Sequence, residues 1–169
     1  MSARARRART LAGAVPDPEL PMIGLADLGV LQRVEEVDGA IRVGLIPTHA
    51  GCPALGAIRA DVVRVLLDAG FDDVEVRIDP EPTWSSDLIS PTGREALRRA
   101  GVSPPGPTGS GPVLVGLGIT RWADHRRDLV CPRCGSVEVE ELSEFGPTPC
   151  LMLARCLACA EPFEHMKEH

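Results

Sequence analysis

The chain has 169 residues, of which 44% are hydrophobic and 25% are charged. This composition is typical of a globular protein, and the length predicts about one domain with a small appendage. No apolar run approaches the roughly 18 residues that a membrane-spanning helix needs. The net charge is −6, and the aromatic residues are only two Trp and three Phe. Because nucleic-acid binding relies on basic residues and on stacking rings, we expect neither a nucleic acid nor a membrane as partner.

Residues 1–10 contain four arginines and no acidic residue. An Arg-rich, acid-poor start can be a transit peptide. Only five residues follow before Pro16, which is too short for a secretory apolar core. We favour a helix with a frayed, solvated basic start. Without an export signal the predicted compartment is the cytoplasm, where cysteine clusters more often bind metal than form disulfides.

A hairpin is predicted near the start of the first patterned block, which extends over residues 11–102. Residues 28–37 and 41–45 are rich in aliphatic and β-branched side chains, and Asp38-Gly39 lies between them. Both turn residues tolerate positive φ. Asp-Gly between two such runs is therefore a strong hairpin signal.

A helix and a third strand follow the hairpin. Residues 53–69 place apolar side chains on one helical face, with Pro53 in the first turn and Gly70 after the last. Residues 74–78 alternate between apolar and charged side chains, and residues 92–100 predict a short second helix. The order ββαβα predicts a small α+β sandwich, in which a three-stranded sheet carries helices on one face.

A segment rich in Pro and Gly divides the chain. Residues 103–118 contain four prolines and five glycines, which neither a helix nor a central strand tolerates. We therefore predict a linker over residues 103–130. The remaining residues, 131–169, are too few to build a stable core without a metal or a disulfide. We expect the linker to keep the cores of the two blocks separate.

The last block contains two CxxC pairs, formed by Cys131, Cys134, Cys156 and Cys159. Each pair can direct both sulfurs at one ion, and four thiolates form a closed tetrahedral site suited to Zn²⁺. Strands predicted over residues 137–142 and 151–155 complete the layout of a zinc ribbon. Rubredoxin-like iron uses the same ligands, and the same four cysteines could instead form redox dithiols or two disulfides. A closed four-sulfur site leaves no position for a substrate, so we predict a structural role.

Other residues of this block are less informative. Cys150 precedes the last predicted strand, where it could be a small buried apolar residue, a fifth ligand or a redox partner. His165 and His169, like His125 before the block, are expected on the surface. Residues 131–169 hold three basic and seven acidic residues, which disfavours nucleic-acid binding by the ribbon.

The sixth cysteine, Cys52, lies where the strand over residues 41–46 runs into the helix that begins at Pro53. At a helix N-cap, free backbone N–H groups and the helix dipole stabilise a thiolate. We therefore expect the pKa of Cys52 to lie below that of a free cysteine. Thr48 and His49 are near enough in sequence to hydrogen-bond it. Such a thiol can be a nucleophile, a redox sulfur or a soft-metal ligand, or it can merely fill the cap position.

Three further residues are candidates for the surroundings of Cys52. Asp17 and Glu19 carry two carboxylates on a proline-bounded segment, and with the thiol they would form a mixed hard and soft ligand set for iron. Their negative charges would oppose the ionisation of Cys52 unless a cation lies between them. Trp84 follows the third strand, and we expect it to be a partly buried lid beside the Cys52 loop, with core filling as the alternative.

Several of these motifs are similar to those of known families. The resemblance to SufT-like iron–sulfur assembly factors rests on Asp17-Pro-Glu19, Asp27-Leu-Gly-Val30, the Asp38-Gly39 turn, Thr48-x-x-x-Cys52-Pro53 and Pro82-Thr-Trp84. A longer set extends the resemblance to the PaaD (PaaJ) family over residues 11–165. It adds GCPAL around Cys52, ISPTGR at 89–94, GVSPP at 101–105, CPRCGS from Cys131, FGPTPC up to Cys150 and EPF at 161–163.

The PaaD resemblance implies an accessory, non-catalytic subunit of the phenylacetyl-CoA ring-epoxidising oxygenase of phenylacetate catabolism. Its partners would be the other subunits, whose iron or iron–sulfur centres it would assemble or maintain, and a homodimer is allowed. The resemblance implies Cys52 as the functional thiol, beside Thr48, Asp17 and Glu19, with a transient iron or iron–sulfur cluster there and structural zinc in the ribbon.

The sequence agrees that the oxygenation chemistry lies elsewhere. It has no pair of Glu-x-x-His motifs for a di-iron site and no GxGxxG after a strand for a flavin or nicotinamide. Two other functions stay open. One is a thiol-redox protein that uses Cys52. The absence of a resolving cysteine at CxxC spacing from Cys52 counts against this function. The other is a purely structural docking subunit.

Overall fold

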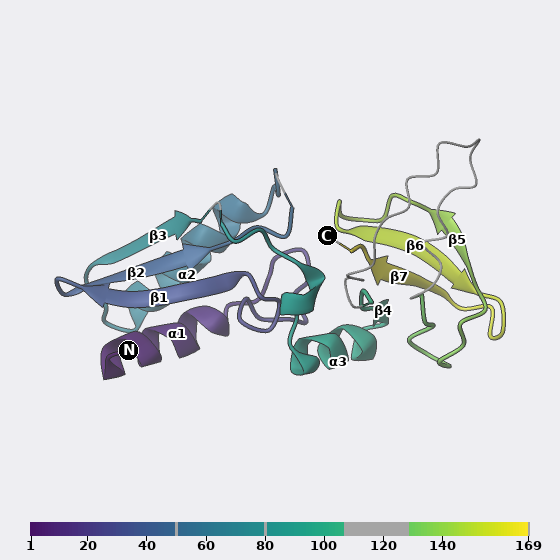
Figure 1. Cartoon of the computed structure of the whole chain (residues 1–169), viewed down its shortest axis with the longest axis horizontal. Coiled ribbons are helices and arrows are strands. Elements are labelled where there is room, and N and C mark those ends of the chain that lie inside the picture. Colours follow the sequence, from purple (N-terminus) through teal and green to yellow (C-terminus); the bar gives the residue numbers. More distant parts are fainter. Residues whose placement is uncertain (50, 80, 107–128, 169) are drawn as a thin grey trace.

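The computed structural model describes residues 1–49, 51–79, 81–106 and 129–168. Two sheets lie beside each other (Figure 1): three strands in the order β1-β2-β3 and four in the order β4-β7-β6-β5. Most of the linker predicted over residues 103–130 lies outside the described residues. Within the described ranges, no helix is both long enough and apolar enough to cross a membrane.

The first sheet is built on the predicted hairpin. Strands β1 (Leu31–Val37) and β2 (Ala40–Leu45) pair antiparallel, and β3 (Val74–Ile78) pairs parallel with β2. Asp38 has φ 53° and Gly39 has φ 86°, so both turn residues adopt the positive φ that the Asp-Gly signal predicts. The predicted three-stranded sheet is therefore confirmed.

Two helices cover one face of this sheet. Helix α1 (Ala3–Gly13) contacts β1 and α2, and α2 (Leu55–Asp68) contacts β3. Ile58, Val62 and Leu66 of α2 are buried, which is the apolar stripe expected from a helical period of 3.6 residues. The mixed α+β architecture with helices on the sheet is confirmed, and the helix expected at the start of the chain is present as α1.

Helix α1 is firmly packed, so the expectation of a frayed start is wrong. Ser2 caps it by accepting a hydrogen bond from the backbone N–H of Ala5 at 3.0 Å. The small residues of this arginine-rich helix face the core: Ala5, Ala8 and Ala12 are buried. The guanidinium groups of Arg4 and Arg7 each lie 5.4 Å from the centre of the Phe71 ring, as in a cation–π contact.

The second sheet takes one strand from the end of the first block, before the Pro- and Gly-rich segment. The strands predicted for the ribbon are present as β5 (Val139–Ser143) and β6 (Leu151–Cys156), and β7 (Pro162–Met166) pairs antiparallel with β6. Helix α3 (Pro91–Arg99) is followed at once by β4 (Val102–Ser103), which pairs parallel with β7. The sequence analysis missed both β4 and β7.

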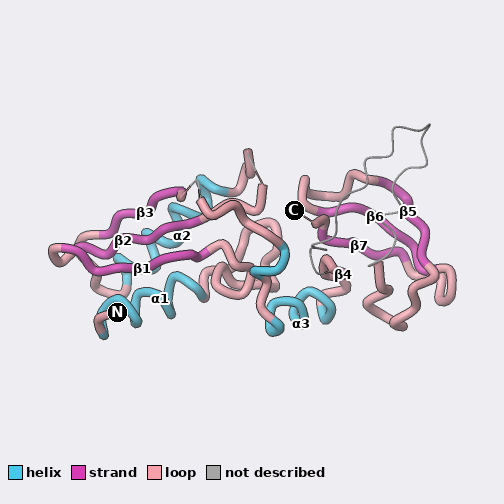
Figure 2. The backbone as a smooth tube through the Cα atoms, viewed as in Figure 1, coloured by secondary structure: helices cyan, strands magenta, loops and turns pink. Residues whose placement is uncertain are grey.

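The two blocks do not have separate cores, so that expectation is wrong. Cys150, Leu151 and Met166 are 3%, 2% and 0% exposed, and they belong to the same buried cluster as the core of the first sheet. Loops and α3 lie between the two sheets in Figure 2, and the C-terminus returns to the same region. A Pro- and Gly-rich segment separates the two blocks in sequence. It does not prevent Cys150, Leu151 and Met166 of the ribbon from packing into the core of the first block.

Two residues are more buried than expected. Trp84 is 2% exposed, and its indole N–H donates to the carbonyl of Leu28 at 3.0 Å, so it is a core residue and not a partly buried lid. His165 is 5% exposed because it lies on β7, and its expected surface position is wrong. The expected surface positions of His125 and His169 lie outside the described residues.

Candidate functional site

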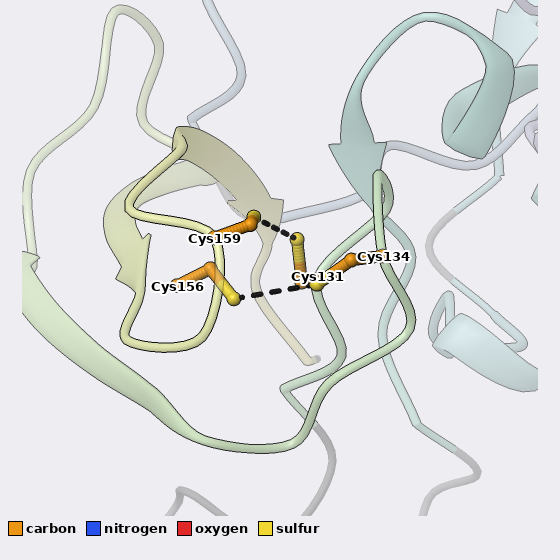
Figure 3. A group of neighbouring side chains, drawn as sticks. All are labelled: Cys131, Cys134, Cys156 and Cys159. Atoms are coloured by element: carbon orange, nitrogen blue, oxygen red, sulfur yellow. Dashed lines mark hydrogen bonds between the residues drawn. The ribbon is translucent and has the colours of Figure 1, made fainter.

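The four ribbon cysteines converge on one point (Figure 3). Their sulfurs all lie within 4.8 Å of one another, with 3.8 Å between Cys131 and Cys159 and 3.5 Å between Cys134 and Cys156. A tetrahedral ion with metal–sulfur bonds of about 2.3 Å has sulfur–sulfur edges of about 3.8 Å. All of these cysteines are free thiols and not disulfides. The donor set therefore fits a tetrahedral metal ion.

Two similar turns position these sulfurs. After Cys131, the backbone N–H of Gly135 donates to the Cys131 carbonyl at 2.9 Å, with Gly135 at φ 75°. After Cys156, at the end of β6, the chain turns through Ala160 at φ 61°, and the Glu161 carbonyl accepts from the Cys156 N–H at 2.9 Å. Each turn uses one positive-φ residue to bring its two sulfurs to the same side.

Without a cation, hydrogen bonding within this group moves the pKa values of Cys134 and Cys156 in opposite directions. The backbone N–H of Cys159 lowers the pKa of Cys156 to about 7. For Cys134 the backbone N–H of Ser136 acts in the same direction, but hydrogen bonds to the neighbouring sulfurs outweigh it and raise the pKa to about 12. A bound divalent cation would remove this conflict, because metal ligation favours the thiolate of every ligand.

The first candidate carboxylate, Asp17, shapes its own loop. It is 6% exposed, and its Oδ1 accepts the backbone N–H groups of Glu19 at 2.8 Å and Leu20 at 3.0 Å. The backbone N–H of Asp17 donates to the Ile23 carbonyl at 3.1 Å, which closes the loop. Burial raises the pKa of Asp17 in spite of the two hydrogen bonds to its carboxylate.

Cys52 lies in the turn between β2 and α2. Its backbone N–H donates to the His49 carbonyl at 3.3 Å. The position of Pro53 had predicted that Cys52 occupies the N-cap of α2. The N-cap is instead Ala54, so Cys52 lies before the cap. Among the described residues, no hydrogen bond joins Thr48 to the Cys52 thiol.

The expected acidity of Cys52 is wrong. Burial raises its pKa, and the negative charges of Glu19 and Asp17 add to that rise. The backbone N–H groups at the start of α2 lower the pKa, as the sequence analysis supposed, but they are outweighed. A helix terminus contributes only about 0.3–1 kcal/mol, less than one pKa unit, so desolvation and two nearby acids reverse its effect.

Glu19 links the candidate groups to one another. Burial raises its pKa, the charge of Asp17 raises it further, and His49 acts in the opposite direction. The carboxylates of the 16–24 loop, the Cys52 turn and His49 are therefore within electrostatic range of one another. Spacing in the sequence could not establish that these groups are close. The hairpin of β1 and β2 lies between residues 17 and 52, so their proximity depends on how the chain folds.

The structure adds Cys150 to this group. It is 3% exposed, its Sγ lies 3.1 Å from Thr148 Oγ1, and the thiol donates to Glu19 Oε2 at 4.0 Å. The sequence analysis left its role open. No spacing signal could have joined Cys150 to Glu19, because their contact depends on how the ribbon packs against the first block.

Comparison with known proteins matches both parts of the chain. The family model "Iron-sulfur cluster assembly protein" matches residues 9–78, and the model "PaaD zinc beta ribbon domain" matches residues 120–167. A protein of Escherichia coli (strain K12), named as a putative subunit of 1,2-phenylacetyl-CoA epoxidase, is 35% identical over 157 residues, which cover 93% of this chain and 88% of that protein.

Solved structures resemble the first block. A domain of unknown function, DUF59, from Bacillus anthracis is 28% identical with a TM-score of 0.52, over 56% of this chain and 92% of that one. A conserved hypothetical protein from Thermotoga maritima is 24% identical over 57% of this chain and 94% of its own, with a TM-score of 0.46. The first of these supports the same fold for the three-stranded sheet and its helices.

Proposed function

The chain belongs to the PaaD family of phenylacetyl-CoA epoxidase subunits, and from this premise we propose that it is an accessory, non-catalytic subunit of that oxygenase in phenylacetate catabolism. Its task is to assemble or maintain the iron or iron–sulfur centres of the other subunits, which are its partners. The match of residues 9–78 to iron–sulfur assembly proteins supports this task. Six free cysteines suit a reducing compartment, so the proposed location is the cytoplasm.

The observation that carries this proposal is the electrostatic grouping of Cys52 with Glu19 and Asp17. A thiol with carboxylates offers both soft and hard donors, a combination that suits iron in transit. Iron, alone or as a cluster, is the cargo of this site. Thr48 lies in the same turn as Cys52 and is the remaining proposed neighbour.

The ribbon has a different proposed role. Cys131, Cys134, Cys156 and Cys159 hold a structural Zn²⁺, because four thiolates close the coordination sphere and leave no open position. The ion supplies folding free energy to a block that is too small to be stable without it. Iron is the competing occupant, and elemental analysis of the purified chain separates the two.

A thiol-redox function fits the site less well. A redox or nucleophilic cysteine needs a lowered pKa in an electropositive environment. Cys52 instead has two acids near it and a raised pKa. A purely structural docking subunit remains the competing function, and it predicts that Cys52 has no part in iron binding.

Anaerobic reconstitution tests the proposal. Zinc-loaded full-length chain is incubated with Fe²⁺ and sulfide, desalted, and examined for sulfur-to-iron charge-transfer absorption and for iron content. We expect the wild-type chain to retain iron and Cys52→Ser to lose most of it. Ala54→Ser is the matched control, because it adds a hydroxyl to the same turn and keeps the thiol. Equal iron retention in Cys52→Ser and wild type would instead support a docking subunit.

A further inference from the structure

Strand β3 forms an open edge of the first sheet. The strand order is β1-β2-β3, so β3 has β2 on one side and no strand of the described ranges on the other. Helix α1 packs against β1, at the opposite side of the sheet, and does not cover this edge (Figure 1). An edge strand presents unpaired backbone N–H and C=O groups, to which another strand can bind.

The free backbone groups of β3 belong to its apolar residues. The Asp73 carbonyl accepts the N–H of Ile41 at 2.9 Å, and the Asp79 N–H donates to the Leu45 carbonyl at 2.8 Å, so both residues face β2. The two backbone groups of a strand residue point to the same side, and that side alternates along the strand. The outward-facing groups therefore belong to the even-numbered positions: Val74, Val76 and Ile78.

The side chains of β3 are complementary to a second copy of the same strand. In an antiparallel pair centred on Val76, position 75 lies opposite position 77 of the other copy. Glu75 and Arg77 then face each other twice, with opposite charges. A pair centred on residue 75 or 77 would instead oppose like charges, which destabilises a strand pair. The register centred on Val76 also uses all five residues of β3.

The backbone directions favour the same register. Because Val76 faces outwards, its two copies form a hydrogen-bonded pair, and Glu75 and Arg77 occupy the neighbouring positions without hydrogen bonds. Opposite residues at such positions have Cα atoms only about 4.5 Å apart, so their side chains lie close together. Within the chain, Arg42 of β2 already lies 3.4 Å from Glu75. Arg77 of the second copy would extend this row of alternating charge.

The outer face of α2 continues this surface. A shallow recess is lined by the whole of β3 and by Arg59 and Val63 of α2. A second recess shares these two residues and reaches Asp68 and Leu67, which is 49% exposed. A two-fold axis through Val76 makes the two α2 helices antiparallel. The end of α2 that carries Arg59 then lies towards the end that carries Asp68 in the other copy.

We propose that the chain forms a homodimer in which β3 pairs antiparallel with β3 of a second copy and the two α2 helices lie side by side. The two sheets then form one continuous sheet. The same surface serves both copies, so the contact is closed and ends at two chains. The apolar side chains of Val63, Leu67 and Ile78 become buried there. The inference is independent of the proposed function, because it uses neither Cys52 nor the ribbon ion.

The charges on β3 do not prevent this pairing. Charged residues often protect an edge strand from other strands. Here the acid and the base are two residues apart, so their pattern fits its own reverse. In the single chain Glu75 forms ion pairs with Arg42 and Arg77, and all three side chains are at least 40% exposed. Exposed ion pairs contribute little to stability, so exchanging Arg77 for that of the second copy costs little.

Sedimentation equilibrium of the full-length, zinc-loaded chain over a series of concentrations tests the inference. We expect the mass to rise from the monomer value of 18.0 kDa to twice that value. Arg77→Glu and Glu75→Arg each oppose like charges twice, so each should weaken the dimer about tenfold or more. The matched controls reverse the charges of an exposed ion pair on α3, in Glu95→Arg and Arg99→Glu, and should dimerise like wild type.

Mixing the two β3 variants tests the register itself. A heterodimer of Arg77→Glu with Glu75→Arg has opposite charges at both facing pairs. We therefore expect the mixture to recover a dimer that neither variant forms alone, and native mass spectrometry identifies it by its mass. Recovery also shows that both variants are folded.

Two further measurements report on the strand and on the helix. Hydrogen exchange of the Val76 amide should slow as the concentration of wild type rises, because its outward N–H gains an acceptor. Leu67→Ser on α2 should weaken the dimer more than Leu142→Ser on the ribbon, because the two leucines are 49% and 51% exposed but only Leu67 lies on the proposed surface.

Each outcome decides the inference. A mass of 18.0 kDa up to the solubility limit overturns it and leaves the β3 edge to a strand of a different protein. An equally stable dimer in both β3 variants also overturns it, because the contact then lies elsewhere. Equal weakening by the α3 reversals would show a general effect of charge and counts against it. Folded β3 variants whose mixture stays monomeric contradict the proposed register.

Discussion

Val102 pairs with Glu164 in parallel register, so a strand that follows α3 forms the edge of the ribbon sheet. The pairing continues at the next position, where Ser103 is fully buried. The side chain of Arg94 on α3 donates to the carbonyls of Ser86, at 2.7 Å, and Pro105. The ribbon is thus joined to the first block by backbone pairing as well as by the shared core.

Removal of the ribbon ion should therefore affect the first block. We expect chelation, or Cys156→Ala, to increase amide hydrogen exchange in β4 and α3 as well as in the ribbon strands, because β4 loses its partner strand. The more distant α1 should be least affected. Hydrogen exchange with and without a chelator measures this. Unchanged protection of α3 after loss of the ion would mean that the two blocks fold independently.

Local elements of this fold could be predicted from the sequence because each has a strong local cause. Asp38-Gly39 sets the hairpin turn, the apolar stripe of α2 has helical period, and the CxxC spacing brings the ribbon sulfurs together. Strand β7 was missed because Pro162 and a run of only five residues give little alternation. Strand β4 was missed because its two residues merge into a Pro- and Gly-rich segment.

The candidate site was harder to predict because it depends on packing between distant segments. The sequence offered Cys52, Asp17 and Glu19 as one candidate group, but spacing could not show whether they converge, because their electrostatic grouping depends on how the chain folds. The start of α2 was expected at Pro53 and lies at Leu55. That small difference removes Cys52 from the cap position, and burial then determines the direction of its pKa shift.

Asp17 provides a test of burial against hydrogen bonding. Asp17→Ala leaves the N–H groups of Glu19 and Leu20 without their acceptor, and we expect it to reduce the free energy of unfolding by about 1–3 kcal/mol. Asp17→Asn keeps an acceptor oxygen and removes the charge, so it should cost much less. Urea denaturation of the two variants, compared with wild type, measures the difference.

The pH dependence of these variants has a definite sign. Because the folded pKa of Asp17 is raised, ionisation costs stability as pH rises from the unfolded value of about 3.9 through the folded pKa. Asp17→Asn does not incur this cost, so its stability relative to wild type should improve across that window and then stay constant. A relative stability that falls with rising pH would contradict the raised pKa.

Two helical glycines form a matched pair. A Cβ at Gly93 on α3 would lie 2.7 Å from the Asp27 carbonyl oxygen, whereas a Cβ at Gly56 on α2 would meet nothing within 4 Å. We expect Gly93→Ala to destabilise the chain by about 1–3 kcal/mol through overpacking. Gly56→Ala should stabilise it by about 0.4–1 kcal/mol through the lower entropy of the unfolded chain. Thermal melts of both variants measure the contrast, and similar shifts in both would contradict the close packing at Gly93.

The reactivity of Cys52 tests the electrostatics of the candidate site directly. Burial and the charges of Glu19 and Asp17 favour the neutral thiol, so the pH midpoint of alkylation should lie above the value of about 8.5 for a free cysteine. The zinc-loaded chain without added iron is labelled across a pH series, and mass spectrometry separates the Cys52 peptide from the Cys150 peptide. Glu19→Gln should lower the Cys52 midpoint because it removes one negative charge, while Glu144→Gln should not. A wild-type midpoint at or below that of a free cysteine would show that the helix N–H groups dominate, and it would favour the thiol-redox function over metal handling.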